Sequence, residues 1–195
     1  MDRLINLRAI EQAQLRRKCS ALTAKLSMLR RLGDSESNIL GVQSNLSIIY
    51  DKLGRNEESL GMRRDVYFGR LKLDGEERYA TLVAANNYAR SLVEQERFEE
   101  ARPLLRQTIP VARRVLGESD QLTLSMRWLH GSNLYMHGRA VDDLREAVTT
   151  LESVAKLWKR IFGDSHPETP RVQNALASAR EKLARAASSE SKAPP

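Results

Sequence analysis

The 195-residue sequence predicts an all-α fold made of consecutive antiparallel helix pairs. Three observations carry this prediction. Gly33, Gly75 and Gly117 are spaced 42 residues apart. The segments between them place apolar residues at helical spacing, and the alternation that marks strands is not sustained anywhere. A fixed period of this length indicates a repeat array, in which neighbouring repeats bury a continuous core.

Further residues keep the same register. A threonine comes six residues after each later repeat-end glycine, at Thr81, Thr123 and Thr169. The turns inside the repeats are marked by Gly54-Arg55, Glu96-Arg97 and Gly138-Arg139. The fourth repeat-end glycine, Gly163, lies 46 residues after Gly117, and the extra residues fall between Gly138 and Ala147. Four residues are about one helical turn, so this insertion lengthens a helix and keeps its apolar face in phase.

Residues 1–33 are predicted to form a basic helix, the second helix of a partial repeat that packs on the first complete one. The apolar stripe of this helix consists of Leu15, Cys19, Leu22, Leu26 and Leu29. Residues 1–31 contain eight bases and two acids, so they hold six of the seven net positive charges. A coil that pairs with a partner, a contact with an anionic membrane and an organellar transit segment are the alternatives for this helix.

Residues 34–186 are predicted to hold the repeats, and residues 187–195 a disordered tail. The second helix of each repeat begins with paired acids, which suit the positive end of the helix dipole. It ends at Gly75, Gly117 or Gly163, where glycine permits a positive φ. Ala101 is placed where two paired helices approach most closely, and Pro110 is predicted to kink or interrupt its helix.

Composition and motifs exclude most chemistry. One cysteine cannot form an internal disulfide, which is typical of a cytoplasmic protein. No nucleotide-binding or hydrolase motif occurs, and no run is apolar enough to cross a membrane. His130 and His137 lack a third ligand for a metal. We therefore expect no catalytic residue, no metal and no cofactor. Nucleic-acid binding is disfavoured because the chain after residue 31 is nearly balanced in charge.

One segment resembles a known family. Residues 86–123 read NNYARSLVEQERFEEARPLLRQTIPVARRVLGESDQLT. This stretch is similar to the 42-residue tetratricopeptide (TPR) repeats of kinesin light chains, and GDSHPET at 163–169 matches their loop. Glu96 departs from the pattern by replacing the turn glycine. The resemblance implies a right-handed TPR superhelix. A HEAT-like α-solenoid, with a period of about 40 to 47 residues, is the alternative architecture.

The resemblance also implies a non-catalytic adaptor that holds a peptide or helix of a partner protein in a concave groove. Groove amides would bind an extended backbone, and groove bases would meet an acidic ligand. The candidate residues are Asn45, Lys52, Asn86, Asn87, Arg90, Arg171 and Asn174. Trp128 and Tyr135 are expected to pack in the core. The alternative function is binding of an anionic surface or RNA through the basic N-terminal helix.

Overall fold

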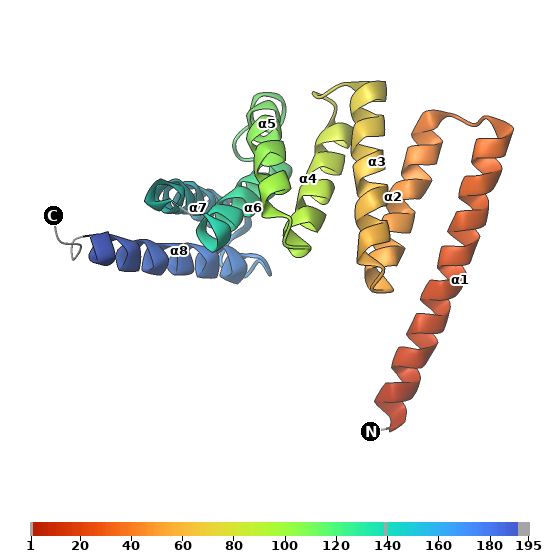
Figure 1. The fold of residues 1–195 in the computed structure, drawn as a ribbon, viewed down its shortest axis with the longest axis horizontal. Helices are drawn as coiled ribbons and strands as arrows, with labels where there is room; N and C mark the ends of the chain where they lie inside the picture. The colour runs from red at the N-terminus through yellow and green to blue at the C-terminus, as the bar shows by residue number, and fades with distance from the viewer. Residues whose placement is uncertain (1, 139, 191–195) are drawn as a thin grey trace. The chain divides into compact units, whose positions relative to one another are not determined.

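The chain folds into α-helices that follow one another along the sequence. The structure is a computed structural model that describes the backbone of residues 2–138 and 140–190. Within those ranges there are eight helices and no strand (Figure 1). The helices are α1 (Asp2–Leu32), α2 (Glu36–Lys52), α3 (Asn56–Asp74), α4 (Tyr79–Glu94), α5 (Phe98–Leu116), α6 (Gln121–His137), α7 (Val141–Phe162) and α8 (Thr169–Glu190). The prediction of an all-α fold is therefore confirmed.

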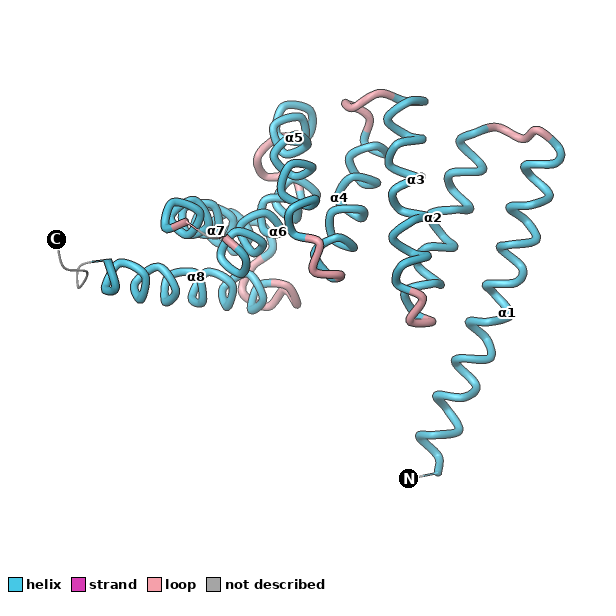
Figure 2. Tube along the Cα trace, in the orientation of Figure 1, coloured by secondary structure: helices cyan, strands magenta, loops and turns pink. Residues whose placement is uncertain are grey.

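These helices form two compact units. The first spans Met1–Gln95 and contains α1 to α4, and the second spans Glu96–Pro195 and contains α5 to α8. The boundary falls in the turn between α4 and α5. In the first unit successive helices run antiparallel, with short loops at alternating ends (Figure 2). Helix α3 packs against both α2 and α4, and α1 packs against α2.

The apolar stripe of α1 supplies part of the core of the first unit. Cys19, Leu26 and Leu29 are buried in one cluster with Leu46 and Tyr50 of α2. This contact is the one predicted for the N-terminal helix. Burial of each such side chain contributes roughly 1.5–3 kcal/mol, so the stripe fixes α1 on α2.

Paired helices come closest at small residues. In the first unit the Ser59 hydroxyl donates to the Ser47 carbonyl oxygen at 2.9 Å. In the second unit a Cβ added to Gly131 would lie 2.8 Å from a carbon of Leu151 and 3.5 Å from the Ala147 carbonyl oxygen. Ala147 is completely buried, and so is Ala101, as the repeat register predicts.

The helix ends follow the predicted glycine pattern. Gly75, Gly117 and Gly163 have φ values of 80°, 91° and 79°. Their ψ values of 166° to 175° place them in a region open essentially to glycine. Helix α8 continues to Glu190, four residues into the segment predicted as a disordered tail, and residues 191–195 lie outside the described part.

Pro110 does not interrupt α5, which runs unbroken from Phe98 to Leu116. The prediction of an interruption was wrong. Pro110 is exposed, as is Arg106, whose carbonyl group loses its N–H partner. Because that carbonyl lies on an exposed turn, water can satisfy it and the helix can continue.

Glu96, in the turn between α4 and α5, has a strained backbone conformation. Glu96 has a φ of 59°, while Gly54 at the same register has 73°. A left-handed φ costs a residue with a side chain roughly 1–2 kcal/mol. Glycine avoids this cost, but its greater freedom in the unfolded chain offsets part of the stabilisation. We expect Glu96→Gly to raise the free energy of unfolding by about 0.5–1 kcal/mol, measured by chemical denaturation.

Gly54→Ala is the matched control. A Cβ at Gly54 meets no atom within 4 Å, so this substitution tests only the cost of the left-handed backbone conformation. The free energy of unfolding of this variant should be about 1 kcal/mol lower than that of the parent. Equal stabilities for Glu96→Gly and the parent would show that the left-handed turn carries no strain.

Candidate functional site

An open groove crosses the first unit between α2 and α4, over α3. Its volume is about 490 Å³. Small residues on the two flanking helices, Gly41 on α2 and Ala80 and Ala84 on α4, leave this space. A Cβ added to Gly41 would meet no atom within 4 Å. The groove is therefore wide enough to accept atoms of another molecule at that point.

Two asparagines face the groove from opposite sides. Asn45 on α2 is exposed, and Asn87 on α4 is half-buried. They are 42 residues apart and so hold the same position in successive repeats. Neither side-chain amide hydrogen-bonds to any residue that the structure describes. Each amide therefore keeps its donors and its acceptor for a ligand.

The groove also contains two arginines whose charges are already neutralised. Arg63 of α3 pairs with Asp51 and donates to the Ser91 hydroxyl at 2.6 Å. Arg70 of α3 pairs with Asp74 at 3.1 Å and also donates to Ser37. Their side chains are only 12% and 16% exposed. These arginines join neighbouring elements and are not poised to receive a carboxylate.

The sequence did not predict the other side chains that line the groove, including its large apolar ones. Tyr79 and Ile48 line it with 60% and 46% of their surface exposed, together with half-buried Val83. Helical spacing was the available signal. Ile48 lies three residues after Asn45, and Val83 lies four residues before Asn87, so both share a face with a predicted residue.

Three other predicted site residues lie outside the groove lining. Asn86 is buried on the inner side of α4. Arg90 lies about one turn beyond Asn87 on α4. Lys52 is exposed in the last turn of α2. The structure thus brings Asn45 and Asn87 together and leaves these three residues apart from them.

The corresponding space in the second unit is filled. Helices α6 and α8 contact each other directly. Trp128 and Tyr135 pack on a buried cluster that contains Ala175 and Ala179, as expected for core aromatics. Arg171 stacks on Trp128, with its guanidinium carbon 5.0 Å from the ring centroid, and also pairs with Glu168. Arg171 and the exposed Asn174 therefore border packed helices.

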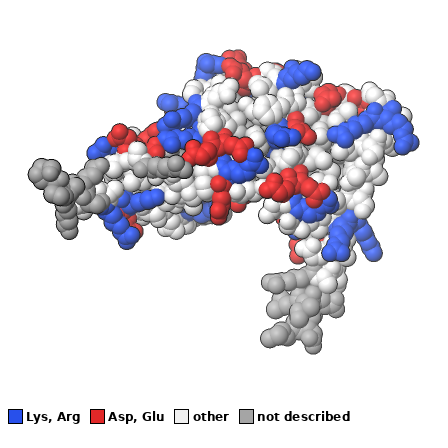
Figure 3. Space-filling model, in the orientation of Figure 1, with Lys and Arg blue, Asp and Glu red and all other residues white. Residues whose placement is uncertain are grey.

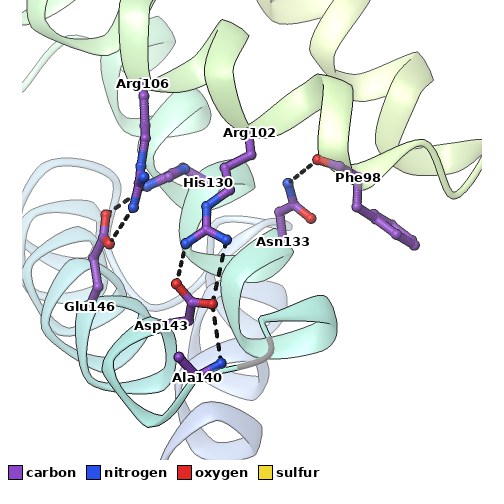
Figure 4. Close-up of polar contacts among 8 residues, drawn as sticks. All are labelled: Phe98, Arg102, Arg106, His130, Asn133, Ala140, Asp143 and Glu146. Carbon is purple, nitrogen blue, oxygen red and sulfur yellow. Dashed lines mark hydrogen bonds and ion pairs between the residues drawn. The ribbon is translucent and has the colours of Figure 1, made fainter.

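The second unit instead holds a network of charged side chains that joins α5, α6 and α7 (Figure 4). Arg102 pairs with the buried carboxylate of Asp143. One carboxylate oxygen of Glu146 accepts a hydrogen bond from the Arg106 guanidinium at 2.9 Å, and the other lies 2.9 Å from His130 Nε2. Short-range sequence patterns could not reveal this network, because Arg102 and Asp143 lie 41 residues apart.

The network changes the proton affinity of its members. Burial lowers the pKa of His130, the pairing with Glu146 opposes this shift, and Arg106 and Arg102 reinforce it. Burial by itself would raise the pKa of Glu146, but His130 and Arg106 together lower it. His130 is therefore neutral near neutral pH, and the network joins helices without needing its charge.

Comparison with known proteins bears on the repeat. Residues 81–121, which span α4 and α5, match the family model described as tetratricopeptide repeat. The chain carries a tetratricopeptide repeat. No curated protein matches the chain by sequence.

Solved structures share the TPR fold over nearly the whole chain. BtubC (BKLC) from P. vanneervenii aligns with 97% of this chain and 79% of its own, at 18% identity and a TM-score of 0.69. A Podosopora anserina protein with nearly identical TPR-like repeats, assigned as a kinesin light chain, aligns with 96% of this chain and 87% of its own, at 20% identity and a TM-score of 0.73. A variant of it gives a TM-score of 0.75 with the same identity and coverage. The resemblance to kinesin light chain-type TPR proteins is thus confirmed.

Within the described part of the TPR array, no three His, Cys, Asp or Glu side chains are grouped as metal ligands. None of the described helices is both long and apolar enough to span a membrane.

The lowered pKa of His130 makes stability depend on pH. Because the folded protein binds fewer protons at His130 than the unfolded chain does, stability falls as the pH drops through the usual histidine pKa of about 6.5. His130→Gln should flatten the decline in melting temperature between about pH 7 and pH 5. An unchanged decline in this variant would show that His130 is not responsible.

Proposed function

We propose that the groove between α2 and α4 binds an extended peptide segment of a partner protein. TPR folds are in general protein–protein interaction modules, and the proposal concerns where and how this chain binds. The observation that carries it is the pair of unpartnered amides, Asn45 and Asn87, on opposite sides of an open groove. The chain would act as an adaptor in the cytoplasm, with no chemical step and no cofactor.

The mechanism follows from the chemistry of an extended backbone. Such a backbone presents N–H and C=O groups along its length, and each asparagine amide can both donate and accept. The exposed parts of Ile48 and Val83 would contact apolar side chains of the peptide. The space beside Gly41 would receive the largest of them.

The groove charges argue for a peptide without a requirement for acidic residues. Arg63 and Arg70 already have carboxylate partners inside the first unit. Displacing either pair would leave a partly buried aspartate without its cation, which is costly. We therefore expect affinity that changes little with salt and lies at about micromolar, because ordering the peptide offsets much of the contact energy.

Filling the groove provides the first test. Gly41→Phe places a ring in the groove without a clash at its Cβ, and it removes a glycine from a helix interior. We expect the melting temperature to hold or rise while affinity for a groove-binding peptide falls at least tenfold, which corresponds to about 1.4 kcal/mol.

Gly61→Phe is the matched control. Gly61 also lies in a helix, α3, and has no atom within 4 Å of an added Cβ, but it does not line the groove. This variant should bind as the parent does. Equal affinities for Gly41→Phe and Gly61→Phe would place peptide binding outside the groove.

The asparagines are tested with peptides selected against the whole chain from a random phage-displayed library. Titration of a selected peptide should shift the side-chain amide resonances of Asn45 and Asn87. Asn45→Ala combined with Asn87→Ala should weaken binding at least tenfold, about 1.4 kcal/mol, with little change in stability. Asn174→Ala, which removes an exposed amide from the second unit, should leave affinity unchanged. The reverse pattern would contradict the proposal.

A further inference from the structure

Helix α1 has a second face that no described element covers. Its packed side is the stripe that meets α2, from Leu15 to Leu29. Away from that stripe the side chains of α1 are exposed from Ala9 to Leu32. We call Arg17, Lys18, Ala21, Ala24, Lys25, Met28, Arg31 and Leu32 the outer face of α1.

The repeat register shows that this face is not a seat for another repeat helix. Position 59 of α3 corresponds to position 17 of α1, one period of 42 earlier. At this position the second helix meets the first helix of its own repeat, and Ser59 and Ala147 are completely buried there. Helix α1 has the exposed Arg17 instead. A preceding helix packed in the repeat manner would bury this guanidinium, which is strongly unfavourable without a partner.

Most arginines of the other helices have an ion-pair partner, among them Arg63, Arg102 and Arg127, whereas the described bases of α1 do not. The six described bases of this helix are Arg16, Arg17, Lys18, Lys25, Arg30 and Arg31, and all are exposed. None forms an ion pair with a described residue. On the visible side of the molecule, blue patches lie over the upper and middle parts of α1 (Figure 3).

Apolar side chains run between these bases. Met28 and Leu32 are 59% and 66% exposed, and Ala21 lies seven residues before Met28 on the same face. Arg17 and Arg31, fourteen residues apart, follow one edge of this line. Lys18 and Lys25, seven residues apart, follow the other. Ile10, which is 51% exposed, continues the line toward the N-terminus. The outer face is thus amphipathic, with an apolar centre and a basic border on each side.

We propose that the outer face of α1 docks on a bilayer surface that contains anionic phospholipids. Positive side chains near such a surface attract its phosphate and carboxylate groups, and the exposed apolar side chains enter the headgroup boundary. A helix of 31 residues extends for about 46 Å, so it can lie along the surface while its other side stays on α2. This role is separate from the groove.

A nucleic acid fits the outer face less well. Proteins that bind single-stranded RNA stack bases on aromatic side chains, and residues 1–33 contain no Phe, Trp or Tyr. Exposed Met28 and Leu32 would gain nothing from phosphate groups, but they gain from lipid. Lipid therefore explains both the charged and the apolar part of the face.

The test uses the full chain and sedimentation with phosphatidylcholine vesicles, with and without phosphatidylserine. Binding should require phosphatidylserine and weaken as salt is added. The triple variant Arg17→Glu, Lys25→Glu and Arg31→Glu should bind at least tenfold more weakly. The double variant Met28→Ser and Leu32→Ser should also bind more weakly, at unchanged charge. Circular dichroism confirms that each variant stays folded.

The matched control reverses three exposed bases elsewhere, Lys72→Glu, Lys156→Glu and Arg160→Glu, for the same change in net charge. It should keep most of the binding. Equal losses in both triple variants, or no binding of the parent to phosphatidylserine vesicles, would overturn the proposal. Full binding by the Met28 and Leu32 double variant, with uridine homopolymer bound more tightly than vesicles, would assign the face to RNA instead.

Discussion

The close approach of paired helices at small residues is the constraint on which the array depends. Ser47 faces Ser59 and Gly131 faces Ala147, and in each case a larger side chain would meet a backbone or core atom at short range. Close packing at these points brings the flanking leucines into contact, and interiors tolerate little error in such contacts. This contact contributes to the 42-residue period of the sequence, because each repeat needs a small residue at the same position.

The groove is a consequence of this packing together with the choice of side chains around it. Helix α3 is held against both α2 and α4, so the two flanking helices are separated by its width. Whether that gap stays open depends on what lines it. Glycine and alanine keep it open in the first unit, whereas Trp128 helps to fill the space between α6 and α8 in the second. One architecture therefore gives a binding surface in one half of the chain and a packed surface in the other.

The sequence predicted the helices and their register because both depend on local spacing. Asn45 and Asn87 were candidates because the resemblance to TPR repeats places them on the groove face, and both line the groove. Arg63 and Arg102 were not identified, because their partners are set by which helices pack together. The filled space in the second unit was also beyond the sequence, although Trp128 stands one period after Asn86. Pro110 shows the opposite limit, because a local rule predicted a kink or an interruption, and the helix continues without interruption on its exposed face.

The charge at position 17 has a consequence for how such an array can grow. Repeat proteins lengthen when a unit is duplicated, and a new unit must find a small residue on the helix that receives it. Duplication inside the chain meets this condition, because internal second helices carry Ser59 or Ala147 at the contact. A unit placed ahead of α1 would meet Arg17 and would need that residue to change first. Adding a repeat ahead of α1 is therefore energetically less favourable than adding one inside the array.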